Sequence, residues 1–389
     1  MTSHLNLQQL EEKLVQTLIQ TKSYESSLNA APPNEKPNWQ NYLKGSLKYA
    51  QELEDMILAH RNSAYYDIRL SDLYKNIWLT TSYGAFKGSL YTGEVIGVEL
   101  EFEGENLYCN PINYWKVSTE NSLRPYKGHL PVEYVLIKPM DRAHVTKALD
   151  YLEKKLEANK ANPIISPRTS THIHLNAQSM TWKQIVTWFV VYALVEDILV
   201  EFSGKERIGN LFCLRTRDTH YFVSCLERAI TSEQFSLITN SDYRYTSMNL
   251  ASVEKFGSVE FRSMRSPIPF SEINKWIDVL VAIKAASLTW KTPSDVVKYF
   301  ETYGPKATLK RIFPEPWMFN LFNHSNLKEI MWEAIREVKD VAYASNWSSK
   351  PSKKTAKEDA VEAGVAYSVS PDAVNFLVTP TPTDPEDWM

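Results

Sequence analysis

Three glutamates recur at every second position in residues 97–104, which read Gly-Val-Glu-Leu-Glu-Phe-Glu-Gly. Side chains alternate between the two faces of a strand, so this spacing predicts that Glu99, Glu101 and Glu103 share one face and that apolar residues occupy the other. Like charges at this spacing repel one another unless a cation lies between them. A divalent cation, which prefers carboxylate oxygens, would turn the repulsion into coordination. The alternative is an edge strand with a solvated acidic face.

Pairs of polar residues two positions apart, with an apolar or aromatic residue between them, recur further along the chain. The instances are His172 with His174, Glu260 with Arg262 and, more weakly, Arg244 in a Tyr-Arg-Tyr sequence. Glu133 adds a carboxylate among apolar and aromatic neighbours. Each pair would point to one face of its strand, so together they favour a single sheet face lined with metal ligands and basic groups. Structural alternatives stay open: core or surface histidines, a salt bridge within residues 260–262, and pairing of Glu133 with a lysine such as Lys138.

A sheet face of this kind suits phosphoryl transfer from a metal–nucleotide complex. Carboxylates hold the cations, which neutralise phosphate oxygens, and arginine stabilises the charge that develops as the γ-phosphoryl group leaves. A neutral imidazole can ligate a metal or hydrogen-bond a phosphate. The sequence contains no P-loop pattern and only 12 glycines. A nucleotide would therefore be held by the sheet face itself.

Composition describes a globular protein rather than a membrane or nucleic-acid-binding one. Of the 389 residues, 43% are hydrophobic and 23% are charged, and the formal net charge of −3 gives no general attraction to nucleic acid or anionic membrane. The longest apolar run, residues 185–195, is too short to span a bilayer, and residues 1–20 show no secretory signal. Three cysteines without zinc-site spacing fit a reducing compartment. These features predict a cytoplasmic protein.

The elements that must position the polar pairs divide into three segments. Residues 1–90 predict an N-terminal helical hairpin extension, with apolar stripes on both sides of a break at Pro32, Pro33 and Pro37. Such a hairpin must bury its stripe on the main domain, the commoner arrangement, or on a partner. Residues 91–345 predict the catalytic domain, and residues 346–389 a polar C-terminal tail without a core of its own.

Within the central segment, strand and helix patterns alternate. Strands are predicted at residues 97–104, 114–117, 131–137, 171–175, 243–250 and 257–262, and helices at residues 145–156, 182–202, 271–289, 293–303 and 327–338. This order favours an α+β fold in which helices cover one face of the sheet.

The order of these motifs resembles that of the amidoligase family, carboxylate–amine ligases with a glutamine synthetase-like fold that are often phage-encoded. The similar elements are a G-x-E-x-E strand at 97–104, a tryptophan and an acidic-x-Ser-Leu-Arg turn at Trp115 and 120–124, a glutamate-bearing strand at Glu133, an H-x-H strand at 172–174, an R-Y-x-x-x-N element at 244–249 and an E-F-R strand at 260–262. The resemblance covers roughly residues 93–267, so the hairpin and the tail lie outside it. Two departures occur: Glu-Asn replaces the usual Asp-Gly at 120–121, and Ser-Met-Arg-Ser follows at 263–266 where Gly-Thr is usual.

The resemblance implies a glutamine synthetase-like antiparallel sheet and an ATP- and Mg²⁺-dependent reaction. ATP would phosphorylate a substrate carboxylate, and an amine would then displace phosphate to form an amide, as a peptide or isopeptide bond. The implied metal ligands are Glu99, Glu101, Glu133 and Glu260. The implied nucleotide-binding residues are His172, His174, Asn249 and Arg262. Arg262 would also stabilise the transferring phosphoryl group, and Arg124 or Arg244 would bind the carboxylate substrate or a phosphate.

Two other functions stay open at this point. One is a metal-dependent hydrolase or nuclease that uses the same carboxylates and histidines, although Arg262 suits phosphoryl transfer and the formal charge offers no footprint for nucleic acid. The other is a non-catalytic structural or virion interaction protein on a ligase fold. The expected partners are a carboxylate and an amine substrate, as small molecules, peptides or proteins. A second copy of the chain or a virion protein could bind the hairpin and the tail, and a phage-encoded chain would act in the host cytoplasm.

Overall fold

A computed structural model describes residues 7–62, 65–120, 122–123, 128–321 and 326–347. In this part of the chain, seven strands form one antiparallel sheet in the order β2-β3-β1-β5-β7-β6, and β4 also pairs with β1. The strands are β1 (Ile96–Glu105), β2 (Trp115–Thr119), β3 (Leu130–Leu136), β4 (Asn162–Ile164), β5 (Ser170–Asn176), β6 (Met248–Asn249) and β7 (Ser258–Arg265). The chain is therefore a mixed helix and sheet protein.

Eleven α-helices and five short 3₁₀ helices complete the described residues. The α-helices are α1 (Leu7–Ala30), α2 (Lys36–Asn62), α3 (Leu70–Thr80), α4 (Arg142–Ala158), α5 (Trp182–Ser203), α6 (His220–Thr231), α7 (Ala251–Phe256), α8 (Phe270–Ser287), α9 (Pro293–Ile312), α10 (Pro316–Asn320) and α11 (Leu327–Tyr343). The 3₁₀ helices are η1 (Tyr65–Asp67), η2 (Lys205–Arg207), η3 (Thr216–Asp218), η4 (Phe235–Leu237) and η5 (Ser241–Tyr245).

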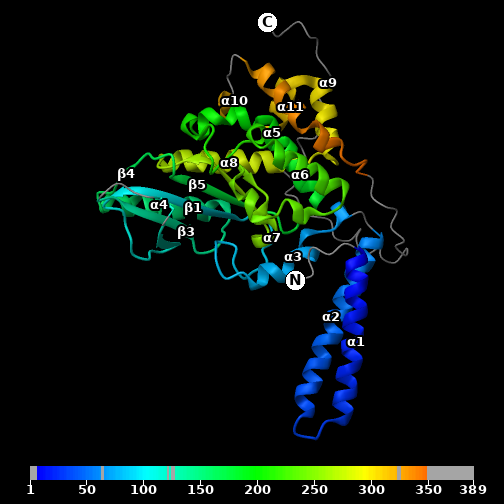
Figure 1. Cartoon of the computed structure of the whole chain (residues 1–389). Helices are drawn as coiled ribbons and strands as arrows, with labels where there is room; N and C mark the ends of the chain where they lie inside the picture. The colour runs from blue at the N-terminus through cyan, green and yellow to red at the C-terminus, as the bar shows by residue number, and fades with distance from the viewer. Residues whose placement is uncertain (1–6, 63–64, 121, 124–127, 322–325, 348–389) are drawn as a thin grey trace. The chain divides into compact units, whose positions relative to one another are not determined.

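Helices cover the apolar face of the sheet, as the sequence predicts. The rings of Trp188 and Tyr192 in α5 contact Phe261 of β7, with centroids 5.5 and 5.1 Å away. The indole of Trp115 in β2 donates a hydrogen bond to the Ala148 carbonyl of α4, and α8 contacts β5. Figure 1 shows α5 and α8 alongside the strands. The opposite face, which carries the alternate residues of β1, is thus left available for polar chemistry.

The helix α5 is apolar almost all round because it is covered on more than one side. It contacts β7 and α8 as well as α9 and α11. A helix with this environment needs no polar stripe. Its first turn is fixed by a capping box, in which Thr181 and Gln184 each accept from the other's backbone N–H. The helix predicted over residues 182–202 is confirmed.

The predicted hairpin is confirmed as the pair α1 and α2, which Figure 1 shows side by side. It has a small core of its own, in which Leu10 is buried with Leu53 and Ile57. The predicted apolar stripe is only partly covered in the described residues, because Val15 and Ile19 remain 56% and 65% exposed. In addition, a proline predicted to lie in the break, residue 37, instead occupies the first turn of α2, where a proline is tolerated.

The strand predicted over residues 243–250 is wrong for most of its length. Arg244 lies in η5, only the two residues of β6 pair with β7, and α7 follows. Local capping explains the difference. The side-chain oxygen of Asn249 accepts from the Ala251 N–H at the start of α7, and Gly257 ends this helix in a left-handed conformation with φ 70°. The two signals turn the chain between β6 and β7.

The main hydrophobic core begins before the first strand, at Tyr65. The helix α3, which the sequence pattern did not predict, contributes Trp78, whose indole donates to the Val253 carbonyl in α7. At the other end of the described chain, Trp347 packs on Tyr66 with ring centroids 5.1 Å apart. Most of the tail predicted over residues 346–389 lies outside the described residues. None of the described helices is both long and apolar enough to cross a bilayer.

Candidate active site

The strand register gathers the predicted site residues on one face of the sheet. Opposite residues in an antiparallel pair point to the same face. The opposed pairs are Glu99 with His172, Glu101 with Glu133, His174 with Glu260, and Glu260 with Asn249. Four strands therefore place carboxylates and imidazoles side by side on the face opposite α4, α5 and α8.

Donor atoms on this face form two groups, each compact enough to hold one cation. Within a group, one donor atom from each residue lies within 4.8 Å of the others. The first group is Glu99, His174 and Glu260, and the second group is Glu101, Glu120 and Glu133. The spacing of these residues along their strands does not predict how the donors divide into the two groups. The sequence places Glu120 in a turn, with a functional role left open, and does not include it among the predicted metal ligands.

Both histidines present a buried ring nitrogen to the first group. Nε2 of His174 lies 3.5 Å from Oε1 of Glu99, while its Nδ1 lies 3.1 Å from the hydroxyl of Ser258. Nδ1 of His172 lies 3.5 Å from Glu99 and 3.4 Å from Glu260. Neither His174 Nε2 nor His172 Nδ1 has a hydrogen-bond partner among the described residues. Nitrogens with this environment, aimed at carboxylate oxygens, fit a shared cation.

A serine relates His172 to the second group. The hydroxyl of Ser170 donates to Oε2 of Glu101 and lies 2.7 Å from Nε2 of His172. A hydroxyl has a single proton, so the second contact requires His172 Nε2–H to donate to the serine oxygen. In the neutral ring with this proton on Nε2, Nδ1 has a lone pair that faces Glu99 and Glu260 and can ligate a cation. In the doubly protonated ring the same Nδ1 would instead donate to these carboxylates.

Glu260 is held between an amide and a guanidinium. Asn249 Nδ2 donates to Oε2 of Glu260, and Arg262 Nη1 donates to Oε1, both at 2.5 Å. Burial raises the pKa of Glu260, but the positive charge of Arg262 and the two imidazoles outweigh burial and hold this pKa below its ordinary value. Arg262 also donates through Nε to the Phe212 carbonyl. The salt bridge considered from the sequence therefore exists and also fixes a basic group at the edge of the donor set.

The second group is rich in negative charge. Burial, with the negative charges of Glu99, Glu101 and Glu120, raises the pKa of Glu133 to about 8. The Ser118 hydroxyl donates to Glu133 Oε2 at 3.3 Å, and among the described residues Glu133 makes no ion pair with Lys138. A carboxyl group whose pKa is raised in this way has no neutralising cation of the protein beside it. This is the environment expected at a metal-binding position.

The two glycines that bracket the acidic strand have physical reasons. A Cβ at Gly97 would lie 3.1 Å from Ala85 Cβ and 3.2 Å from His174 Cβ. A Cβ at Gly104 would lie 2.3 Å from the Asn162 carbonyl oxygen of β4. Gly97 thus lets β1 pack closely beside Ala85 and His174, and Gly104 lets β4 approach β1.

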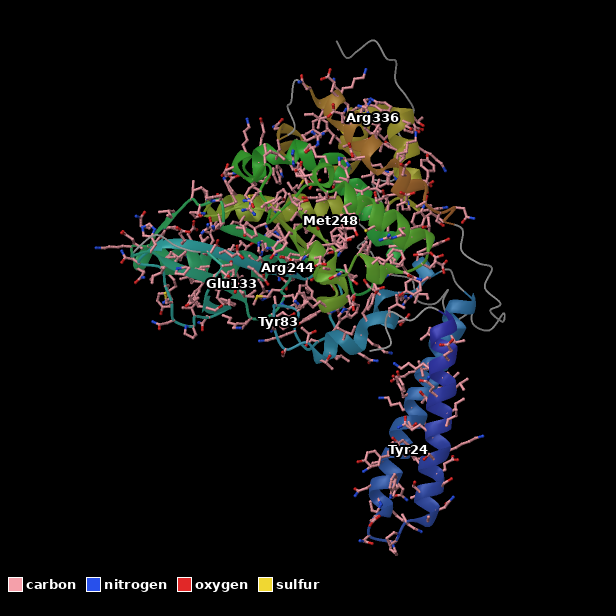
Figure 2. All side chains as sticks on the ribbon, in the orientation of Figure 1. Tyr24, Tyr83, Glu133, Arg244, Met248 and Arg336 are labelled. Atoms are coloured by element: carbon pink, nitrogen blue, oxygen red, sulfur yellow. The ribbon has the colours of Figure 1, made fainter. Side chains whose placement is uncertain are left out.

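All three residues of the first group, and Glu133 of the second, line a cavity of about 590 Å³. Its remaining walls come from the segment that precedes β1, from η5 and from α7. Figure 2 labels Tyr83, Glu133 and Arg244, three lining residues that come from three different segments and lie near one another in this view. Arg244 therefore reaches the cavity although its predicted strand is absent. Arg124, predicted to bind a carboxylate or a phosphate, lies outside the described residues.

No family model matches this sequence, and no curated protein matches it. The support for a function is therefore the chemistry of the donor groups, Arg262 and the cavity.

Proposed function

We propose that this chain is an ATP- and Mg²⁺-dependent carboxylate–amine ligase with a glutamine synthetase-like fold. The observation that carries the proposal is the pair of carboxylate and imidazole donor groups on one sheet face beside a large cavity. An antiparallel sheet with helices on one face and these donors on the other is compatible with that fold.

The donor groups fit two divalent cations. Oxygen-rich donors suit Mg²⁺, and the buried nitrogens of His172 and His174 without hydrogen-bond partners fit a cation shared with the first group. When bound, Mg²⁺ would neutralise phosphate oxygens of the nucleotide. Ser170 and Ser258 would keep the imidazole tautomers fixed for that role.

Arginines supply the positive charge that the metals do not. Arg262 is held by Glu260 and the Phe212 carbonyl at the edge of the donor set, where its planar fork suits the oxygens of a transferring phosphoryl group. Arg244 lines the cavity further out and stacks on the ring of Tyr245, with Cζ 4.6 Å from the centroid. We assign Arg244 to the carboxylate substrate.

The reaction balances without a redox partner. A carboxylate oxygen of the substrate bonds to the γ-phosphorus of ATP, and the bond from that phosphorus to the bridging oxygen breaks to release ADP. The amine nitrogen then bonds to the acyl carbon, the bond from that carbon to the phosphate oxygen breaks, and phosphate and a proton leave. The substrates are thus a carboxylate and an amine, with ATP as the phosphoryl donor.

The first experiment separates this ligase from a metal-dependent hydrolase. Calorimetric titration with Mg²⁺ and the non-hydrolysable analogue AMP-PNP should show metal-dependent binding to the wild type and its loss in Glu101→Gln. Glu105→Gln, the same change at an exposed position of the same strand, is the matched control. Incubation with ATP, a carboxylate panel and hydroxylamine should then release ADP and form a hydroxamate in equal amounts. Metal-dependent hydrolysis of a substrate in the absence of ATP would contradict the proposal. Absence of nucleotide binding by the wild type would contradict it as well.

A further inference from the structure

Four basic side chains surround the mouth of the cavity, beyond the donor groups. They are Lys87 in the segment before β1, Lys116 in β2, Arg244 in η5 and Lys255 in α7. All four are exposed, and they come from four separate elements. We call this set the basic rim. All four side chains line the same cavity.

The four cations of the basic rim have no acidic partner among the described residues. None of its four members makes an ion pair with a described residue. By contrast, Arg142 binds Asp278 through two hydrogen bonds, and Arg215 contacts both Asp197 and Asp218. The carboxylates that line the cavity are Glu99, Glu133 and Glu260 of the donor groups, which the proposed metals would neutralise, and Glu254, which accepts a hydrogen bond from the Thr239 hydroxyl. The rim charge is therefore available to a ligand.

One member of the rim, Lys255, is held against two aromatic rings. Lys255 Nζ lies 4.5 Å from the ring centroid of Tyr83 and 5.2 Å from that of Phe256. These two rings contact each other edge to face at 5.4 Å, and the hydroxyl of Thr81 donates to the Lys255 carbonyl. Burial lowers the pKa of Lys255, and the negative charge of Glu260 opposes this shift without cancelling it. The segment before β1 is thus fixed against α7 and forms a wall of the cavity.

The spacing of the rim suits an extended ligand better than a compact one. Lys116 lies opposite Val135, which lies opposite Glu99, so two strand spacings of about 4.8 Å separate Lys116 from the first donor group. Lys255 comes from α7, which connects β6 to β7 at the opposite end of the strand order from β2. A triphosphate anchored by two metals is compact, so it would contact basic side chains at one part of the cavity only. Cations spread around the mouth instead match several separate anionic groups on one molecule.

We propose that the basic rim selects a polycarboxylate: the substrate that supplies the reacting carboxylate carries further carboxylates, as in an acidic peptide. This inference depends on the proposed ligase for the identity of the reacting group. The amine substrate is the poorer occupant, because a protonated amine would be repelled by the rim. Lys87 and Tyr83 lie outside the part of the chain that resembles the amidoligases, so the segment before β1 would adapt the site to this substrate.

The test compares two peptides that differ in charge alone. Acetyl-Glu-Glu-Glu carries four carboxylates, and acetyl-Gln-Gln-Gln carries one. Each is titrated into the full chain at low and at moderate salt, with and without Mg²⁺ and AMP-PNP. The triglutamate should bind at least about ten-fold more tightly, with the difference shrinking as salt screens the rim. Lys87→Glu and Lys116→Glu should each weaken triglutamate binding about five-fold.

Two controls make the result specific. Lys147→Glu reverses an exposed lysine of α4 outside the cavity and should leave peptide binding unchanged. Nucleotide binding should be the same in Lys87→Glu, Lys116→Glu and the wild type. Equal affinity for the two peptides, no binding of either, or rim variants that weaken AMP-PNP instead of the peptide would overturn the inference. Failure of AMP-PNP to bind the wild type would remove the ligase while leaving the peptide preference as a separate result.

Discussion

Nδ1 of His174 lies 3.1 Å from the hydroxyl of Ser258, and this contact leaves Nε2 to face Glu99. Ser258 is fully buried at the start of β7, two residues before Glu260. One strand therefore supplies a carboxylate of the first donor group and the hydroxyl that positions its imidazole. Groups that orient a metal-binding histidine commonly contribute 10- to 100-fold to metal affinity.

We expect Ser258→Ala to weaken divalent cation binding by at least about ten-fold with little change in fold, because the imidazole loses its orienting partner. Calorimetric titration with Mn²⁺, as a probe for the Mg²⁺ positions, measures the effect. Ser287→Ala removes an equally buried hydroxyl that binds a helix carbonyl outside the site, and it should bind Mn²⁺ like the wild type. Equal affinities in the two variants would show that Ser258 does not position the ligand.

Replacing Glu101 with alanine should abolish turnover and leave the fold intact. The change removes a carboxylate of the second donor group and with it part of the repulsion that raises the pKa of Glu133. We expect the free energy of unfolding to change by less than about 1 kcal/mol. ADP release and urea denaturation measure the two effects separately. Turnover equal to that of the wild type would refute the assignment of Glu101.

Arg262→Lys should lower turnover although the charge is kept. Lysine can still approach Glu260, but it lacks the planar fork that reaches Glu260 and the Phe212 carbonyl at once. Arg265→Lys is the matched control, since Arg265 lies on the same strand and binds the Phe202 carbonyl away from the cavity. Similar rates of ADP release in both variants would argue against a phosphoryl-stabilising role for Arg262.

Glu196 predicts a pH dependence of stability that is separate from the active site. Burial raises the pKa of this carboxyl to about 7, although hydrogen bonds from Ser247 and the Thr216 N–H oppose the rise. The folded chain thus holds a proton that the unfolded chain has already lost. The stabilisation is complete below the ordinary glutamate pKa and is lost as pH rises toward 7, by up to about 3 kcal/mol.

Glu196→Gln should therefore show a flatter dependence of unfolding free energy on pH than the wild type between pH 4.5 and 7. Urea denaturation at a series of pH values measures it. Glu201→Gln, an exposed change on the same helix, controls for the loss of one charge. Parallel curves for Glu196→Gln and the wild type would show that Glu196 does not carry the dependence.

Gly104→Ala should destabilise the sheet by roughly 1–3 kcal/mol. The added methyl group would lie 2.3 Å from the Asn162 carbonyl oxygen, so β4 would have to move away from β1. Gly45→Ala, at a helical position with nothing within 4 Å, should not lower stability. Urea denaturation of the two variants checks the contrast, and a Gly104→Ala chain as stable as the wild type would contradict the close approach of β4.

The sequence predicts that carboxylates and imidazoles share one sheet face, because the alternation of side chains along a strand is a local property. The spacing of Glu99 and Glu101 and of His172 and His174 assigns their faces without any tertiary information. The division into two donor groups depends on register, which brings Glu133 opposite Glu101 and is visible only in the folded sheet. The alternation along a strand places the residues of each pair on one face, but it gives no distance between residues of different strands.

The errors arose where capping or long-range packing decides the structure. The alternation in residues 243–250 resembles a strand, but Asn249 and Gly257 direct the chain into α7. Lys87 carried no signal, because it reaches the cavity only when the segment before β1 packs on α7 through Tyr83. Long-range contacts of this kind leave no period in the sequence.

The contact between Tyr66 and Trp347 sets limits for any shortened version of this chain. A version that begins at residue 91 would discard the hairpin together with Tyr65, Trp78 and Phe86, which belong to the main core. Removing only α1 and α2 would keep every one of these side chains, and ending the chain before Trp347 would uncover Tyr66. A shortened chain that keeps the main core should therefore run from η1 to Trp347, and comparing its mass in solution with that of the full chain would isolate what the hairpin adds to assembly.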